Sequence, residues 1–536
     1  MGHSLFDKHY HFSKAKATAQ LEKLAKSPFD LTNPKEMTPE RLSKMVASSG
    51  GLRLLYGAQQ VTEETIEELY ALALEAKVFE KMEAQQAGEV MNFIEGQESE
   101  ERPVLHTAVR DFFDSPNPAP KAHEATEAAK GEFKKLEAFM KRVDEEGRFT
   151  DMLFIGIGGS ELGPKTLYYG LQGYAKVNRT VHFISNVDPD DAAQALRGLD
   201  LKRTLVVSVS KSGGTLETKT NEDLIRHHYR EAGLDPQQYF IAATGQGSPM
   251  DDKGRFLECF YIWNWIGGRY CATSVIGGIV IAFACGFDAY RDLLRGANQM
   301  DRIALKRDIH ENLPLLAALL GIWNRNFLGH PTLAIIPYSQ MLIRFAAHIQ
   351  QVDMESNGKR IDRWGRESDC HTCPIVWGEP ATNAQHSFFQ MIHQGTDVVP
   401  LEFIGFRETQ CGLDLEQNGT TSQEKLLANL FAQCLALAMG KKSPNPNKNF
   451  PGGRPSSLLL ARRLDPYTLG MLAAFYEHKI DFQGYIWNIN SFDQEGVQLG
   501  KVLANKLLER IGARKGGAGG EPYPLGDVLL DQLNAL

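Results

Sequence analysis

Two loops have the residue types of a phosphate-binding site. Residues 156–163, Gly-Ile-Gly-Gly-Ser-Glu-Leu-Gly, follow an apolar run that predicts a strand, and a helix is predicted after them. Residues 210–218 follow a second such run and include the hydroxyls of Ser210, Ser212 and Thr215. Backbone N–H groups at the start of a helix, together with nearby hydroxyls, attract anions. The two loops therefore indicate a site for a phosphate monoester.

Neither loop fits the fingerprint of a nucleotide-binding protein. A dinucleotide loop would need glycine where Glu161 stands, and a nucleotide P-loop would need lysine directly after Gly163, where Pro164 stands. A phosphosugar is therefore the better candidate. The alternative is structural: the glycines would only form a tight turn, and the hydroxyls would only cap a helix. The residue types of the two loops alone do not decide between phosphate binding and a structural role.

Arg269 and Glu355 are candidates for acid–base chemistry. Arg269 directly follows Gly267 and Gly268, so little side-chain bulk would separate its guanidinium from a bound oxyanion. Arginine stays protonated and can stabilise negative charge. Glu355 lies in a polar run near the end of a predicted helix and is a candidate base. A surface arginine and a solvated carboxylate are the ordinary alternatives.

Three further polar residues could complete such a site. His386 could exchange protons near neutral pH, although many histidines only bond to backbone. Gln494 and Lys501 are seven residues apart, which predicts that they share one face of a helix that follows a strand. For Lys501 the ordinary alternative is a position facing solvent.

The elements that must position these residues follow a repeated pattern. Short apolar and β-branched runs alternate with helix-length segments, which predicts βαβ units and parallel sheets. The predicted strands are residues 152–157, 181–185, 204–209 and 239–243 and, after a helical stretch over 275–328, residues 332–337, 374–377, 398–404 and 483–489. Two α/β units are expected.

The chain divides into four predicted regions. Residues 1–115 have helical periodicity and end before a segment with three prolines, Pro116, Pro118 and Pro120. The two α/β regions are expected over 121–300 and 310–505. A C-terminal tail over 506–536 contains the glycine-rich connector 516–520 and a short apolar helix over 525–536.

Composition places the chain among ordinary globular proteins. Its 536 residues are 43 % hydrophobic and 23 % charged, with a net charge of -8 and no long block of one sign. We therefore expect no nucleic-acid or membrane partner. The first residues lack the apolar stretch of a secretory signal, and no later segment approaches the ~20 uninterrupted apolar residues of a membrane span, so a cytoplasmic location is expected. The seven scattered cysteines predict reduced thiols. The Cys370 and Cys373 pair has CxxC spacing but no second pair, so a structural role is expected.

Four segments, in this order, resemble the phosphoglucose isomerase (glucose-6-phosphate isomerase) family. They are residues 267–270, 354–359, 385–386 with 393–396, and 491–494 through 500–501, within a match from about 102 to 501. The resemblance implies two sugar-isomerase (SIS) α/β subdomains with parallel sheets flanked by helices. It also implies a homodimer with active sites at the subunit interface, and reversible conversion of glucose 6-phosphate to fructose 6-phosphate.

The same resemblance implies a role for each candidate residue. Those expected to hold the phosphosugar are Gly159, Ser160, Ser210, Lys211, Ser212 and Thr215, with further polar contacts from Gln351 and Gln494. His386 and Lys501 would assist ring opening, Glu355 would move the proton between C1 and C2, and Arg269 would support the enediolate. The reaction has no net redox change, so no nicotinamide and no metal are expected.

The sequence differs from the family pattern in two places, and two alternative functions must be weighed against the isomerase. Ala381 and Ala384 stand where similar enzymes commonly have glycine, and Gly213 and Gly214 make the second loop unusually bare, which bears on rate more than on reaction type. A non-catalytic sugar-phosphate sensor would share the fold. An amidotransferase would need an N-terminal nucleophilic cysteine, but the chain begins Met-Gly-His.

Overall fold

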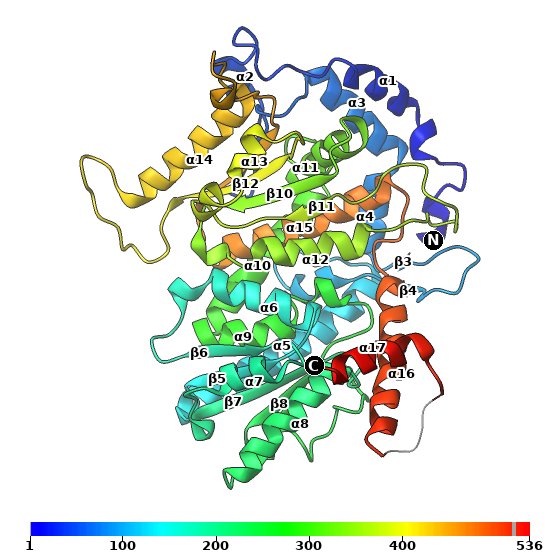
Figure 1. Cartoon of the computed structure of the whole chain (residues 1–536), viewed down its shortest axis with the longest axis vertical. Helices are drawn as coiled ribbons and strands as arrows, with labels where there is room; N and C mark the ends of the chain where they lie inside the picture. The colour runs from blue at the N-terminus through cyan, green and yellow to red at the C-terminus, as the bar shows by residue number, and fades with distance from the viewer. Residues whose placement is uncertain (1, 517–520) are drawn as a thin grey trace. The chain divides into compact units, whose positions relative to one another are not determined.

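The computed structural model describes residues 2–516 and 521–536 and divides into two units, Met1–Ser491 and Phe492–Leu536 (Figure 1). The second unit contains helices α16 (Gln498–Arg514) and α17 (Pro524–Asn534), the latter close to the short helix expected over 525–536. Of the predicted connector 516–520, residues 517–520 lie outside the described residues. The predicted domain boundaries stay predictions.

A five-stranded parallel sheet occupies the first α/β region. Its strands are β5 (Asp151–Ile155), β6 (Thr180–Ile184), β7 (Thr204–Ser210), β8 (Phe240–Thr244) and β9 (Glu258–Tyr261), in the order β6-β5-β7-β8-β9. Every residue of the central strand β7 is buried, as expected for a parallel strand covered on both faces. Four of these strands lie within two residues of the predicted ranges, and β9 was not predicted.

A six-stranded mixed sheet occupies the second α/β region. Four strands run parallel: β10 (Thr332–Pro337), β11 (Ile375–Trp377), β12 (Leu401–Glu408) and β13 (Ser456–Arg463). The hairpin of β1 (Val46–Ser49) and β2 (Leu52–Leu55) extends the sheet, because β2 pairs antiparallel with β13. The N-terminal region, predicted as helical, therefore also contributes two strands to this sheet. A separate pair joins β3 (Val90–Asn92) to β4 (Arg102–Pro103).

The predicted strand over 483–489 is wrong. These residues end helix α15 (Pro466–Ile486) and continue into the turn after it, and the strand that precedes this helix is β13. From Thr468 to Ile486 every residue of α15 is buried. A helix without a polar face has no 3.6-residue hydrophobic period, so its apolar run cannot be told from a buried strand.

Helices cover the sheets and fill the space between them; α8 (Leu216–Glu231) packs on β7, and α14 (Ser422–Met439) packs on β12 (Figure 1). Besides α15, the other α-helices of the first unit are α1 (Lys16–Ala25), α2 (Pro39–Lys44), α3 (Glu63–Glu75), α4 (Val78–Gln86), α5 (Pro120–Glu146), α6 (Gly159–Gly170), α7 (Pro189–Leu196), α9 (Val275–Cys285), α10 (Phe287–Ala304), α11 (Leu313–Ile322), α12 (Phe345–Asn357) and α13 (Phe389–Gln394). Among the described residues, one stretch, Gly268–Cys285, is apolar and long enough to span a membrane. It is 89 % buried within the structure, as a core helix would be.

Candidate active site

The glycine loop after β5 lies directly against the loop that carries Arg269. A Cβ atom added to Gly159 would stand 2.3 Å from the carbonyl of Gly268, so only glycine fits at this approach. Gly158 has a φ of 58°, and Cys271 Sγ lies 3.2 Å from the Gly159 carbonyl oxygen. Two segments that the sequence predicted as separate parts of a site are therefore in contact. Ser160 is half-buried in the first turn of α6, where helix N–H groups favour an anion.

The loop after β7 gathers the predicted hydroxyls and one cation. Ser210 Oγ lies 2.8 Å from Thr215 Oγ1 and 3.5 Å from Ser212 Oγ, immediately before α8. Lys211 Nζ donates to the Ile266 carbonyl at 2.9 Å, which brings this loop beside the Arg269 loop. Burial of Lys211, reinforced by the charge of Arg102, lowers the pKa of its ammonium to about 8. The glycine loop after β5 and the hydroxyl loop after β7, called the phosphate-type loops below, therefore both lie beside the loop that carries Arg269.

Arg269 is buried and held from two sides. It lies in the short helix η7 (Gly268–Tyr270), and 2 % of it is exposed. Its Nε donates to Ser356 Oγ at 2.6 Å, and its Nη2 donates to the Ser491 carbonyl at 2.6 Å. Hydrogen bonds from a charged donor are strong, so the guanidinium has a defined orientation.

Glu355 lies beside Arg269 in the last turn of α12. Its Oε1 is 3.7 Å from Arg269 Nη1, and its side chain is 22 % exposed, so a small molecule can reach it. Gln351, one helical turn earlier, donates from Nε2 to Glu355 Oε2 at 3.1 Å. The Gln351 amide also borders the glycine loop, because a Cβ on Gly158 would lie 3.5 Å from its Nε2. A carboxylate, a guanidinium, an amide and an anion-binding loop therefore meet.

The structure does not bring all predicted residues into this cluster. His386 ends the short helix η10 (Asn383–His386) and is exposed, and its side chain makes no hydrogen bond or ion pair with any described residue. Gln494 and Lys501 belong to the second unit. They do not share a helix face, because Gln494 has an extended φ of -150° and α16 begins only at Gln498. Their approach to Glu355 stays a prediction.

Sequence reasoning missed a layer of polar residues behind Arg269. Tyr270 Oη donates to Asp481 Oδ1 at 2.8 Å and lies 3.1 Å from Ser356 Oγ. Tyr270 and Ser356 stand next to Arg269 and Glu355 in the sequence, and this adjacency was the available signal. Asp481 had none, because it lies in the part of α15 just before the residues that were assigned to a strand.

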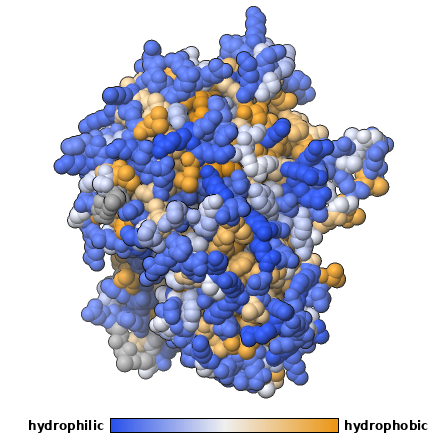
Figure 2. All heavy atoms as spheres, turned by 180° about the vertical axis from the view of Figure 1, so that it is seen from behind, coloured by the Kyte–Doolittle hydropathy of each residue, from blue (hydrophilic) through white to orange (hydrophobic). Residues whose placement is uncertain are grey.

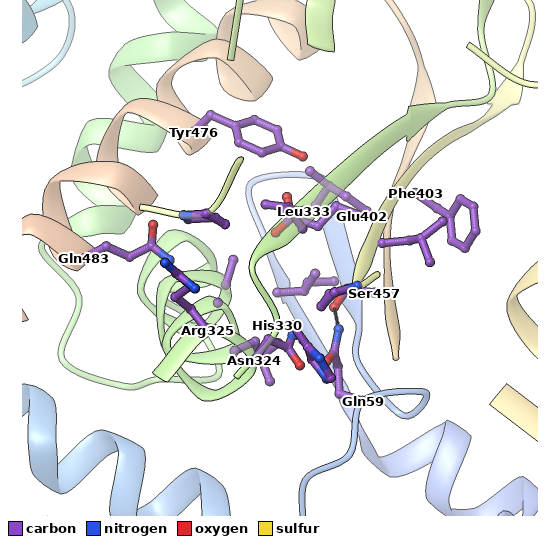
Figure 3. A pocket seen from close by; sticks show the side chains of 18 of the residues that line it. Gln59, Asn324, Arg325, His330, Leu333, Glu402, Phe403, Ser457, Tyr476 and Gln483 are labelled. Carbon is purple, nitrogen blue, oxygen red and sulfur yellow. Dashed lines mark hydrogen bonds between the residues drawn. The ribbon is translucent and has the colours of Figure 1, made fainter. Parts of the chain in front are cut away.

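A second pocket lies away from this site. It is a small cavity of about 30 Å³ at the amino ends of strands in the second sheet, between the sheet and helices α11 and α15, and Figure 3 shows the side chains that line it. Thr332 begins β10, Leu401 begins β12, and Gln483 reaches the cavity from α15. None of the site residues predicted from the sequence lines it. The phosphate-type loops, in contrast, follow the carboxyl ends of β5 and β7, where ligands bind in α/β sheets.

Comparison with known proteins gives a consistent picture. The family model for phosphoglucose isomerase matches residues 55–518. A glucose-6-phosphate isomerase of Protochlamydia amoebophila is 55 % identical over 525 residues, which cover 98 % of this chain and 97 % of that protein. One of Chlamydia pneumoniae is 48 % identical over 523 residues, 98 % of each chain. The crystal structure of a glucose-6-phosphate isomerase from Chlamydia trachomatis superposes with a TM-score of 0.94 at 47 % identity, covering 98 % of this chain and 100 % of that one.

Proposed function

This chain belongs to the phosphoglucose isomerase family, and we propose that it interconverts glucose 6-phosphate and fructose 6-phosphate by moving one proton through a cis-enediolate. The reaction is an aldose–ketose isomerisation of glycolysis and gluconeogenesis. The observation that carries the proposal is the pair formed by Glu355 and the buried Arg269, whose charged atoms are 3.7 Å apart beside two phosphate-type loops.

Glu355 is the base in this mechanism. A proton next to a carbonyl is only weakly acidic, so its removal needs a positioned base and positive charge where the enediolate forms. Glu355 takes the proton from C2 of the aldose, which gives an enediolate with negative charge on O1. The hydroxyl proton then passes from O2 to O1, and Glu355 returns its own proton to C1. Arg269 stabilises the negative charge on the enediolate oxygen in both steps. Gln351 supports this role because its amide holds one carboxylate oxygen and orients the other.

The phosphate group anchors the far end of the substrate. The first turn of α6 with Gly159 and Ser160, and the loop with Ser210, Ser212 and Thr215, supply N–H and O–H donors. Lys211 adds a positive charge between them and the Arg269 loop. Binding energy at the phosphate, remote from the reacting carbons, orients C1 and C2 at Glu355.

Ring opening precedes proton transfer and is assigned to His386 and Lys501. Opening a hemiacetal needs one proton delivered to the ring oxygen and another taken from the anomeric hydroxyl. An imidazole can do either near neutral pH, and His386 is exposed and without a partner among the described residues. Lys501 lies on the exposed helix α16, and Gln494 would add a polar contact to the sugar.

A homodimer with active sites shared between subunits is part of the proposal. Helix α14 exposes Phe431, Leu435 and Met439, each 41 % exposed, and the loop before it exposes Leu413 and Leu415 at 90 % and 65 %. Figure 2 shows apolar patches among hydrophilic side chains on the face that it views. Exposed apolar side chains in such numbers favour burial against another chain. We infer a cytoplasmic location from the seven free cysteines.

Proton exchange tests the assigned base. Wild-type protein should convert fructose 6-phosphate to glucose 6-phosphate without added cofactor. Glu355→Gln should bind the phosphosugar but lose isomerisation and exchange of the C2 proton with solvent by about 10²–10⁴-fold, the usual contribution of a general base. The measurements are a coupled assay and loss of a C2 deuterium label, with mannose 6-phosphate as a second substrate.

An exposed glutamate provides the control. Glu367, whose side chain is 74 % exposed, is far less buried than Glu355, and Glu367→Gln should keep wild-type turnover. Near-normal turnover in Glu355→Gln would refute the assigned base. A wild-type protein that binds fructose 6-phosphate but never turns it over would instead favour a sugar-phosphate sensor.

A further inference from the structure

A chain of buried hydroxyl groups connects Arg269 to a second carboxylate. Arg269 Nε donates to Ser356 Oγ at 2.6 Å, Ser356 Oγ lies 3.1 Å from Tyr270 Oη, and Tyr270 Oη lies 2.8 Å from Asp481 Oδ1. All four residues are at most 2 % exposed. They come from η7, α12 and α15, so the chain joins three elements that are far apart in the sequence.

The hydrogen bonds in this chain have one consistent direction. The guanidinium has no acceptor, so it donates to Ser356. Tyr270 has a single hydroxyl proton and donates it to Asp481, so the Ser356 hydroxyl must donate to Tyr270 Oη. In each of the three hydrogen bonds the donor is therefore the group nearer to the positive Arg269, and the acceptor is the group nearer to the negative Asp481. In a buried environment of low dielectric constant such aligned hydrogen bonds polarise and strengthen one another.

Asp481 is itself held in place. Gln85 Nε2 donates to Asp481 Oδ2 at 2.8 Å, and the amide of Gln85 is oriented by Tyr485, whose hydroxyl donates to Gln85 Oε1. Burial raises the pKa of Asp481, and the donors from Gln85 and Tyr270 and the charges of His478 and Arg269 offset only part of this rise. Both carboxylate oxygens accept a hydrogen bond, which is the arrangement that an ionised carboxylate requires.

The ring of Tyr270 is fixed as well. His106 stacks on it with ring centroids 4.5 Å apart and an interplanar angle of 18°. The ring therefore cannot swing its hydroxyl away from Ser356 and Asp481. The hydrogen-bonded side chains from Asp481 to Ser356 therefore form a rigid support for the Arg269 guanidinium.

We propose that Tyr270 and Asp481 are positioning residues that hold the Arg269 guanidinium, through Ser356, at its distance from Glu355. This inference rests on the proposed function. Glu355 attracts Arg269 directly, at 3.7 Å, and Asp481 attracts it through the hydroxyl chain. The hydrogen-bonded chain of side chains holds the guanidinium too far from Glu355 for a hydrogen bond between them. Without it, Arg269 and Glu355 would close into a bidentate ion pair, the base would be occupied, and the charge meant for the enediolate would be neutralised.

Removal of one oxygen atom tests the support. Tyr270→Phe deletes the middle link and keeps the ring that stacks on His106. We expect kcat to fall about 10²-fold, the effect of a misplacement of about 1 Å in an active site, while KM for fructose 6-phosphate stays within about twofold. A phosphosugar analogue with a carboxylate where the enediolate forms should bind about 10²-fold more weakly, because it needs the positioned guanidinium. Asp481→Asn and Ser356→Ala should show the same pattern.

A second buried tyrosine provides the matched control. Tyr290 donates to the Thr273 carbonyl at 3.1 Å and is 2 % exposed, but it has no hydrogen bond to the chain behind Arg269. Tyr290→Phe should lower the thermal midpoint and leave kcat unchanged. The double variant Tyr270→Phe with Ser356→Ala should lose no more than either single variant, because both break the same chain.

The possible outcomes separate the inference from the proposed function. Folded Tyr270→Phe with wild-type kcat, or with a raised KM at unchanged kcat, would overturn the positioning role while leaving the isomerase assignment intact. If Tyr290→Phe loses as much kcat as Tyr270→Phe, the loss reflects reduced stability alone, and this result would also overturn the positioning role. A wild-type protein without isomerase activity would refute the proposed function, and the inference with it.

Discussion

At the scale of single residues, Lys211 is the site residue whose charge changes just above neutral pH. Burial lowers the pKa of its ammonium to about 8, and the nearby charge of Arg102 acts in the same direction. The ammonium is therefore charged below pH 8 and neutral above it. A sugar phosphate has its second pKa near 6 and is a dianion over this range, so the change lies on the protein side. The contribution of Lys211 to phosphate binding is present below pH 8 and lost above it.

The expected result is a KM that rises with pH. Between pH 7 and 9 the charged fraction of Lys211 falls about tenfold, so KM for fructose 6-phosphate should rise by up to about tenfold. Lys211→Arg should flatten this rise, because the guanidinium stays charged. Steady-state kinetics at a series of pH values would measure the change in KM. Lys219 is exposed, and Lys219→Met is the control that should keep the wild-type pH profile. A KM that is constant from pH 7 to 9 in the wild type would contradict the assignment.

Residues next to one another in a motif could be predicted, and residues joined only by the fold could not. Gly159, Gln351, Glu355, Arg269 and the hydroxyl loop are brought together as expected. The two phosphate-type loops follow β5 and β7, whose positions were predicted to within two residues, whereas the Arg269 loop follows β9, which was not predicted. Asp481 reaches Tyr270 across 211 positions of sequence, and its own surroundings have no motif. The chemical roles of all the site residues stay predictions, and for His386, Gln494 and Lys501 their place in the site stays a prediction as well.

At the scale of elements, two glycines let α10 and α15 cross closely. A Cβ on Gly470 of α15 would stand 1.9 Å from the Leu293 carbonyl oxygen, and one on Gly296 of α10 would stand 1.8 Å from the Tyr467 carbonyl oxygen. In both cases the obstacle is backbone, so no side chain can move aside. The crossing matters for the site, because α15 also carries Asp481.

Gly470→Ala should therefore destabilise the protein despite the higher helix propensity of alanine. We expect a loss of about 1–3 kcal/mol in the free energy of unfolding, the usual cost of overpacking. The matched control is Gly131→Ala in α5, where a Cβ would meet nothing within 4 Å. That exposed substitution should stabilise the protein by up to about 1 kcal/mol. Thermal midpoints of the two variants would decide, and a Gly470→Ala midpoint at or above that of the wild type would disprove the close crossing.

The same helix explains which elements sequence could predict. Strands β5 to β8 are short apolar runs between amphipathic segments, so their periodicity is unambiguous. Helix α15 is buried all round and was partly assigned as a strand, while β13, which precedes it, was missed. The hairpin of β1 and β2 was missed because its four-residue strands lie within a region of helical periodicity, and because β2 pairs with β13, about 400 positions later. Pairing at that separation leaves no local signal.

At the scale of the whole molecule, the proposed homodimer allows His386 to act in its own subunit or in the partner subunit. In the first unit, Glu355, Gln351, Arg269 and the glycine loop are linked by contacts within one chain. His386, in contrast, is exposed and has no partner among the described residues. In a dimer with two-fold symmetry, a residue exposed near the interface can complete the site of the other subunit. We therefore expect His386 to act across the interface.

Mixed dimers test this expectation. In a dimer of one Glu355→Gln subunit and one His386→Ala subunit, one site would contain both substitutions and the other neither, if His386 acts across the interface. Random association makes about half of the dimers mixed, each with one intact site of two, so co-expression should restore about a quarter of wild-type activity. Glu355→Gln mixed with Arg269→Ala is the matched control. Those two residues belong to one site in one chain, so every site stays damaged and no activity should return. Restoration in neither mixture would place His386 in the site of its own subunit, and a monomeric mass in sedimentation would refute the dimer itself.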